Sequence, residues 1–185
     1  MARIPTVTRD AVPPDERAAY DAFCANRGSE PKIGPRSLIA HMPEMAQRLE
    51  ALRTWIRKEA SLSQTLQELV MLTVAREMNC GFIWYAHAAA ARQAGVRNDI
   101  VDNIRENRAL ANRAPDEEIA VGFAQQVLRD RKVDKATFDA AAAQFGQRGV
   151  MTLTNLIACY AVLAYNMNTY ELQAPAHATE PALPA

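Results

Sequence analysis

The amino-acid sequence predicts an all-α domain of about seven to nine helices, and three observations lead to this fold class. Runs of alternating β-branched residues are nearly absent, whereas residues that favour helices, such as Ala, Leu, Gln, Glu and Arg, dominate the chain. Apolar positions recur at helical spacing between breaks made by Pro and Gly. A length of 185 residues, of which 49% are hydrophobic, suits one domain with a substantial core.

Local signals place the ends of the expected helices. Pro14 and the two acidic residues after it favour a helix start, because Pro fits the first turn and negative charge complements the helix dipole. Ser61 or Ser63 can cap a later helix, and Gly95 suits the position just beyond a helix end. The expected helices cover residues 14–26, 36–41, 43–60, 64–78, 82–94, 98–106, 116–131, 134–145 and 150–170. The apolar stripe of the helix over 43–60 is Met45, Leu49, Leu52 and Ile56.

The chain divides into three parts by composition. Residues 1–27 are expected to form an N-terminal helical arm, and residues 28–170 a single helical domain. The segment 171–185 has few residues that could be buried, so we expect a tail that is disordered or lies on a neighbouring subunit. His177 lies in this tail and is assigned no role.

Charge and cysteine usage narrow the classes of function. The formal net charge is zero, so we expect neither nucleic acid nor an anionic membrane as a partner. The most apolar run, residues 150–167, carries Thr and Asn residues and is predicted to be a core or interface helix. The N-terminus lacks the apolar core of a signal peptide. Three widely spaced cysteines therefore indicate reduced thiols and a cytoplasmic protein.

The residues with the strongest chemical potential lie on one predicted helix and the helix before it. Cys80 and His87 are seven residues apart, close to two helical turns, so both project from the same face with Trp84 between them. Glu68 stands one helix earlier in an apolar setting. An acid, a thiol and an imidazole that meet in an apolar site favour proton-transfer chemistry.

This pattern resembles the carboxymuconolactone decarboxylase family, which includes the alkylhydroperoxidase D-like proteins. Glu68, Cys80 and His87 stand at the spacing of the Glu, first Cys and His of the peroxidase branch, but Ile83 occupies the position of its second Cys. Trp84-Tyr85-Ala86-His87 is similar to the Trp-x-x-His of the decarboxylase-like branch, with Ile83 at the position of an acidic residue. Residues 34–48 and 91–104 extend the likeness, which covers about residues 30–170.

The resemblance implies an alkylhydroperoxidase D-like fold, a homo-oligomer (dimer, trimer or hexamer) and an enzyme of the decarboxylase or lyase type. It would act on a small organic acid or lactone, without a cofactor. His87 would serve as general acid or base, and Glu68 would orient it or share its proton. Ile83 and Trp84 would shape an apolar substrate pocket. No metal site is expected, because the sequence lacks the usual ligand spacings.

Other interpretations of the same residues stay open at this point. Cys80 alone could support a thiol-dependent peroxidase or a redox sensor, although Ile83 removes the disulfide partner. A non-catalytic helical oligomer that binds a small ligand is a third possibility. His41 would either line the pocket or cap the helix that begins at Pro43.

The two central residues also have plain structural interpretations. A buried carboxylate needs a partner, so Glu68 could simply pair with Arg76 or Arg92. Cys80 could be a small core residue rather than a reactive thiol.

Overall fold

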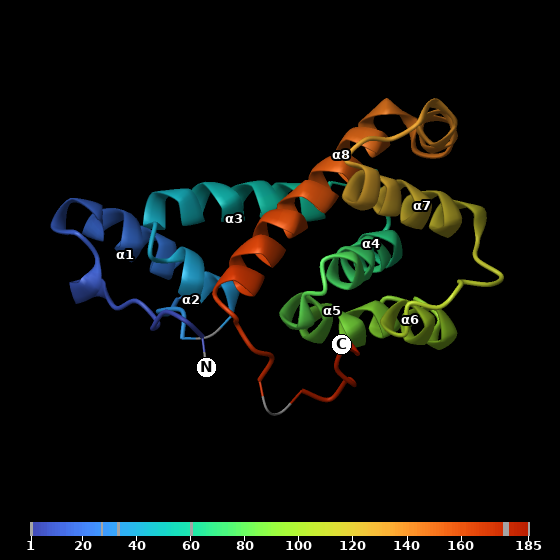
Figure 1. Cartoon of the computed structure of the whole chain (residues 1–185). Helices are drawn as coiled ribbons and strands as arrows, with labels where there is room; N and C mark the ends of the chain where they lie inside the picture. Colours follow the sequence, from blue (N-terminus) through green and yellow to red (C-terminus); the bar gives the residue numbers. More distant parts are fainter. Residues whose placement is uncertain (1, 27, 33, 60, 176–177, 185) are drawn as a thin grey trace.

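A computed structural model describes residues 2–26, 28–32, 34–59, 61–175 and 178–184. The described residues form eight α-helices and two short 3₁₀ helices without any strand, so the predicted all-α class is confirmed (Figure 1). The elements are η1 (Arg9–Ala11), η2 (Pro14–Glu16), α1 (Arg17–Ala25), α2 (Pro35–Ile39), α3 (Pro43–Lys58), α4 (Gln64–Glu77), α5 (Gly81–Gln93), α6 (Asn98–Arg105), α7 (Pro115–Asp130) and α8 (Lys135–Thr169).

Helix α4 lies at the centre of the fold. It contacts α5, α6, α7 and α8, and Figure 1 shows it enclosed between α7 and α8 on one side and α5 and α6 on the other. Every residue from 66 to 75 is buried, including Glu68. The helix begins at Ser63, whose side chain accepts a hydrogen bond from the Leu66 N–H, so one of the two predicted capping residues is used.

A tight joint folds α5 back onto α4. Asn79 adopts a left-handed conformation (φ 46°), which Asn tolerates better than most residues, and Cys80 is the N-cap of α5. The reversal packs α5 against α4. It therefore carries His87 back to the level of Glu68, which precedes it by 19 residues.

The inward face of α3 agrees with the predicted apolar stripe at Met45, Leu49 and Ile56 but not at Leu52. Leu52 is 45% exposed, so its assignment to the buried stripe was wrong. Ala46 and Glu50 are buried instead, and the side chains of Arg53 and Arg57 are largely covered. These four positions follow the 3.6-residue period of the helix and face the body of the fold, because α3 packs against α1, α2 and α8. One charged stripe of α3 thus points inward.

The N-terminal arm packs on α3 with a small core of its own. Val7, Val12, Tyr20 and Phe23 form this core with residues of α2 and α3. The Tyr20 hydroxyl donates a hydrogen bond to the Val7 carbonyl, and this tie fixes the arm against α1. The limits of the three parts predicted from composition stay predictions.

Helix α8 has a break near the predicted place. Gly146 has non-helical angles (φ 67°, ψ 172°), but residues 147–149 are helical, so the break is shorter than the predicted one over 146–149. Among the described residues, α8 is the helix that is long and apolar enough to cross a membrane, judged by length and composition alone. However, 56% of its most apolar stretch is buried inside the fold, which is typical of a core helix.

Candidate functional site

Glu68 and His87 form a buried carboxylate–imidazole pair. Glu68 is 1% exposed in the middle of α4, and its Oε2 lies 2.7 Å from His87 Nδ1 on α5. The other carboxylate oxygen, Oε1, accepts a hydrogen bond of 2.7 Å from Arg57 Nη2 on α3. Both oxygens of a nearly inaccessible carboxylate are therefore satisfied by cationic or titratable donors.

Tyr160 extends this pair into a cluster drawn from four helices. Arg57 Nη1 donates to the Tyr160 hydroxyl on α8 at 3.2 Å. The ring of Tyr160 meets the ring of His87 edge to face, with 5.2 Å between their centroids. Helices α3, α4, α5 and α8 thus each contribute one side chain, and packing on several sides restricts the rotamers of all four.

The surroundings favour the ionised form of Glu68. Burial by itself would raise the pKa of this carboxyl, but the hydrogen bond and charge of His87, followed by those of Arg57, outweigh it and hold the pKa below its ordinary value of 4.5. Burial raises the pKa of the Tyr160 hydroxyl, and the nearby Arg57 opposes that rise only in part. The cluster accordingly combines a carboxylate, a guanidinium and a neutral phenol around His87.

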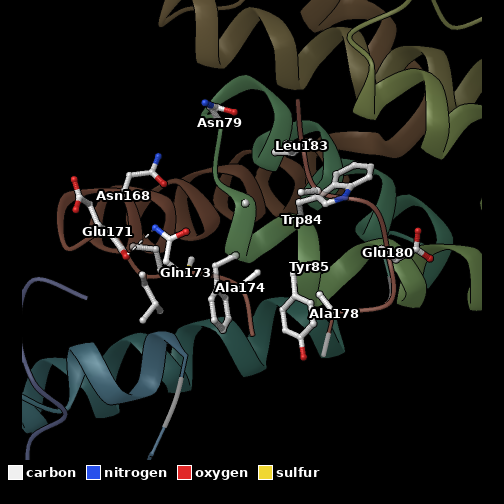
Figure 2. Close-up of a pocket in the computed structure, with 15 residues that line it drawn as sticks. Asn79, Trp84, Tyr85, Asn168, Glu171, Gln173, Ala174, Ala178, Glu180 and Leu183 are labelled. Atoms are coloured by element: carbon white, nitrogen blue, oxygen red, sulfur yellow. Dashed lines mark hydrogen bonds between the residues drawn. The ribbon is translucent and has the colours of Figure 1, made fainter. Parts of the chain in front are cut away.

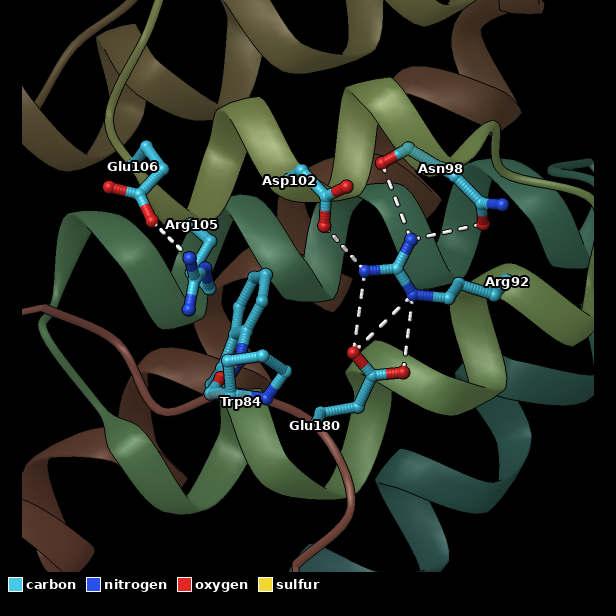
Figure 3. Close-up of polar contacts among 8 residues, drawn as sticks. Trp84, Arg92, Asn98, Asp102, Arg105, Glu106 and Glu180 are labelled. Atoms are coloured by element: carbon cyan, nitrogen blue, oxygen red, sulfur yellow. Dashed lines mark hydrogen bonds and ion pairs between the residues drawn. The ribbon is translucent and has the colours of Figure 1, made fainter.

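The partners suggested for Glu68 by the sequence were wrong. Arg92 instead pairs with Asp102 at 2.6 Å and with Glu180 at 3.1 Å, as Figure 3 shows. Arg76 donates to the backbone carbonyls of Arg105 and Pro184. Both arginines lie on the side of α4 and α5 that faces α6 and the tail, whereas Glu68 points toward α3.

Arg57 and Tyr160 were missed by the sequence analysis. Arg57 stands in the last turn of α3, where a basic residue has a helix-dipole explanation and draws no attention. The sequence nevertheless indicated a charged face of α3, because Glu50, Arg53 and Arg57 recur at helical spacing. Tyr160 carries no comparable signal within an apolar helix.

Cys80 lies at the start of α5 and is fully buried. Burial raises the pKa of its thiol, and the backbone N–H groups of Phe82 and Ile83 counteract this only partly. Ile83 is itself 2% exposed and packs in the main core. No hydrogen bond or ion pair in the described part of the chain joins the Cys80 side chain to Glu68 or His87. Hydrogen bonds thus bring together two of the three predicted catalytic residues.

Trp84 packs under the C-terminal tail. Its indole N–H donates a hydrogen bond of 2.8 Å to the Pro181 carbonyl, and the ring is 1% exposed. Figure 2 shows Trp84 and Tyr85 beside Glu180 and Leu183 at the wall of a cavity of about 550 Å³ between α5, the end of α8 and the tail. This cavity is not lined by Glu68 or His87.

His41 lies at the exposed turn before α3. Its Nε2 is 3.0 Å from the Pro5 carbonyl, which ties the turn to the N-terminal arm. No contact among the described residues joins His41 to Glu68 or His87. Likewise, the described part of the chain has no group of three or more His, Cys, Asp and Glu residues that could hold a metal ion.

The cluster reaches the surface through its two less buried members. The side chains of His87 and Arg57 are 14% and 30% exposed. Arg57 also borders a surface hollow of about 320 Å³ together with Arg53, Thr54 and Lys58. A small molecule in this hollow would therefore meet Arg57 before Glu68.

Several solved structures share the fold of this chain. An uncharacterised peroxidase-related protein with an alkylhydroperoxidase AhpD core, from Ralstonia eutropha JMP134, is 20% identical with a TM-score of 0.74 and covers 95% of this chain and 93% of its own. The debrominase Bmp8 is 18% identical with a TM-score of 0.69 and covers 93% and 91%. A putative antioxidant defence protein AhpD from Agrobacterium tumefaciens is 16% identical with a TM-score of 0.68 and covers 75% and 96%. The predicted alkylhydroperoxidase D-like fold is confirmed.

A family model matches the middle part of the sequence. Residues 43–126, from the start of α3 into α7, match the model of the carboxymuconolactone decarboxylase family. Glu68, Cys80 and His87 all lie inside the matched region, which confirms the resemblance predicted from their spacing. Over this region the chain is similar to the carboxymuconolactone decarboxylase family. The comparison with curated proteins gives no match.

Proposed function

We propose that the protein is an enzyme that transfers a proton on a small organic acid or lactone, as a decarboxylase or a related lyase. The observation that carries the proposal is the hydrogen bond of 2.7 Å between the buried Glu68 carboxylate and His87 Nδ1. A carboxylate on one ring nitrogen fixes the tautomer of the imidazole and leaves the other nitrogen, Nε2, to exchange a proton with a substrate. His87 is accordingly the catalytic acid or base, and Glu68 is its positioning residue.

The proposed decarboxylation begins at the bond that holds the carboxyl group. The bond between the carboxyl carbon and its neighbour breaks, CO₂ leaves, and the electron pair forms an enolate with the adjacent carbonyl. Protonated His87 then gives its Nε2 proton to the carbon, becomes neutral and regains a proton from water. Glu68 supports the imidazolium through the charge-assisted hydrogen bond at Nδ1. Arg57, fixed by Glu68 and Tyr160, adds positive charge that stabilises the enolate oxygen.

A panel of β-keto acids, unsaturated lactone acids and simple lactones tests this function. We expect the purified protein to release CO₂ from, or to isomerise, at least one member, and to introduce deuterium at the protonated carbon in D₂O. Peroxide consumption with an external thiol is measured in parallel. Turnover of peroxide without turnover of any acid or lactone would reject the proposal in favour of a thiol peroxidase.

The thiol-based alternative has support from the fold neighbours but not from the site. Two neighbours are described as a peroxidase-related protein and a putative antioxidant defence protein. In this chain, however, Cys80 is fully buried with a raised pKa, and Ile83 supplies no second thiol. Because the thiolate is the reactive form, both features weaken peroxidase chemistry at Cys80.

Cys80 is expected to resist modification in the folded protein. Native protein treated with iodoacetamide or mild peroxide should carry no label or sulfenic acid at Cys80, whereas protein unfolded in guanidinium should be labelled there. Peptide mass spectrometry measures both states. The half-buried Cys24 serves as the internal control, since it is the more accessible thiol. Selective oxidation of native Cys80 would revive the redox interpretation.

We also propose that the protein works as a homo-oligomer in the cytoplasm. Large apolar side chains are exposed on the outer faces of α3 and α8, among them Trp55, Met151, Val162 and Tyr165. Positions 151, 158, 162 and 165 follow one face of α8, and such a stripe is typical of an interface. Light scattering coupled to size-exclusion chromatography should give a dimer, trimer or hexamer. Tyr165→Glu should shift the oligomeric state toward the monomer. A monomeric wild-type protein would contradict the proposal.

A further inference from the structure

A second cavity lies one helical turn away from the Glu68–His87 cluster. It has a volume of about 270 Å³ and lies between α2, α3, α5 and α8. Its walls are mostly apolar, with Ile39, Leu49, Phe82 and Leu163, whereas its polar groups are Arg36, Glu50 and Arg53. Apolar walls with a few convergent polar groups are typical of sites for small molecules.

The described residues that line this cavity carry a net positive charge. Two arginines and one glutamate line it, so their formal charges add to +1. Glu50 bridges the two guanidinium groups at 3.4 Å from Arg36 Nε and 3.5 Å from Arg53 Nη2, which are long separations for ion pairs. The Arg36 Nε–H is buried and makes no hydrogen bond within the described residues. A bound anion would offset this charge.

Arg53 is the more available of the two arginines. Arg36 is already held, because its Nη2 donates to the Phe23 carbonyl at 2.8 Å and its guanidinium lies over the Phe23 ring. Arg57, one turn further along α3, is likewise engaged by Glu68 and Tyr160. The Arg53 side chain keeps 24% of its surface exposed, and its ion pair within the described residues is the long contact to Glu50. Its planar fork suits a carboxylate from a ligand.

Two helices connect the cavity to the catalytic cluster. Arg53 precedes Arg57 by four residues on α3, and Leu163 follows Tyr160 by three on α8, so each cavity residue lies about one turn (about 5.4 Å) from a cluster residue on the same helix face. A ligand anchored at Arg53 that is one ring long would extend toward the cluster.

We propose that this cavity binds the carboxylate of a small apolar monocarboxylic acid through Arg53 and Arg36. The small volume and apolar walls fit a single ring or a short aliphatic chain, and Glu50 repels a second carboxylate. Nucleotides and polyanions do not match a site with one net positive charge. The further step, that the bound acid is the substrate of His87, rests on the proposed function.

Calorimetric titration with benzoate tests the cavity without any need for turnover. The wild-type protein should bind benzoate, whereas benzamide, benzylamine and the dianion phthalate should each bind at least about tenfold more weakly. Arg53→Gln should weaken benzoate by about tenfold or more. Arg48→Gln is the matched control, because Arg48 lies on the same helix with a largely exposed side chain, and its benzoate affinity should equal that of the wild type.

The outcomes separate this cavity from the proposed function. Absence of benzoate binding at about 10 mM, equal affinity for benzoate and benzamide, or an unchanged affinity in Arg53→Gln would each overturn the cavity proposal. The benzamide comparison uses only the wild-type protein, so it holds even if a variant fails to fold. Benzoate binding without turnover of any acid or lactone would keep the cavity and reject the function. Turnover that is independent of Arg53 would keep the function and reject the step that the acid bound in the cavity is the substrate of His87.

Discussion

Replacing His87 with alanine is expected to lower kcat for the acid or lactone substrate by about 10²–10⁴-fold, because general acid–base groups contribute rate factors of this size. His87→Ala removes the proton-transfer group but leaves Glu68 paired with Arg57 at 2.7 Å. The melting temperature should therefore fall by only a few degrees. If substrate binding depends mainly on the cavity beside Arg53, KM should change much less than kcat.

Chemical rescue distinguishes a catalytic from a structural role of His87. Added imidazole should restore part of the activity of His87→Ala, because a free base can enter the space that the side chain leaves. Gln144→Ala, at an exposed position of α8, is the control and should show neither loss nor rescue. A His87→Ala variant that keeps wild-type kcat would remove His87 from the mechanism.

The pairing of Glu68 with His87 was predictable because it depends on local features. A helix, a break at residues 79–81 and a second helix form a hairpin, and side chains on the facing sides of its two helices meet. Residues such as Ser63, Asn79 and Gly95 indicate in the sequence where helices begin and end. The fold class and the joint between α4 and α5 therefore needed no tertiary information.

The rest of the cluster could not be predicted, because it depends on contacts between residues far apart in the sequence. Arg57 and Tyr160 are separated by 103 residues, and their contact depends on how α8 crosses α3. Periodicity alone also misplaced one position of α3, because Leu52 is apolar yet exposed, and it did not reveal that Glu50 is charged yet buried. Charged residues that form ion pairs between helices can replace apolar residues on a buried face. The sequence pattern of one helix does not show which residues of other helices form these pairs.

Replacing Glu68 with alanine is expected to destabilise the protein by about 3 kcal/mol. Removal of one member of a buried ion pair commonly costs about 3–5 kcal/mol, and the lower end applies because Arg57 retains 30% exposure and can turn toward water. For a chain of this length, the melting temperature should fall by roughly 6–12 °C. Glu68→Gln, which keeps the shape and part of the hydrogen bonding, should lose about 1–2 kcal/mol.

The pH dependence of this loss identifies its electrostatic cause. The folded-state pKa of Glu68 lies below its ordinary value of 4.5, so the carboxylate contributes its full stability above pH 4.5 and loses it as the pH falls through the folded pKa. The gap in unfolding free energy between wild type and Glu68→Gln should thus be constant near neutral pH and shrink in acid. Urea titrations at several pH values measure this gap in unfolding free energy. Asp139→Asn is the control. The exposed ion pair of Asp139 with Lys135 should contribute no more than about 0.5 kcal/mol to stability at every pH. A gap that stays constant into acid would mean that Glu68 stabilises the fold by packing alone, and His87 would then lack the charged partner that orients it.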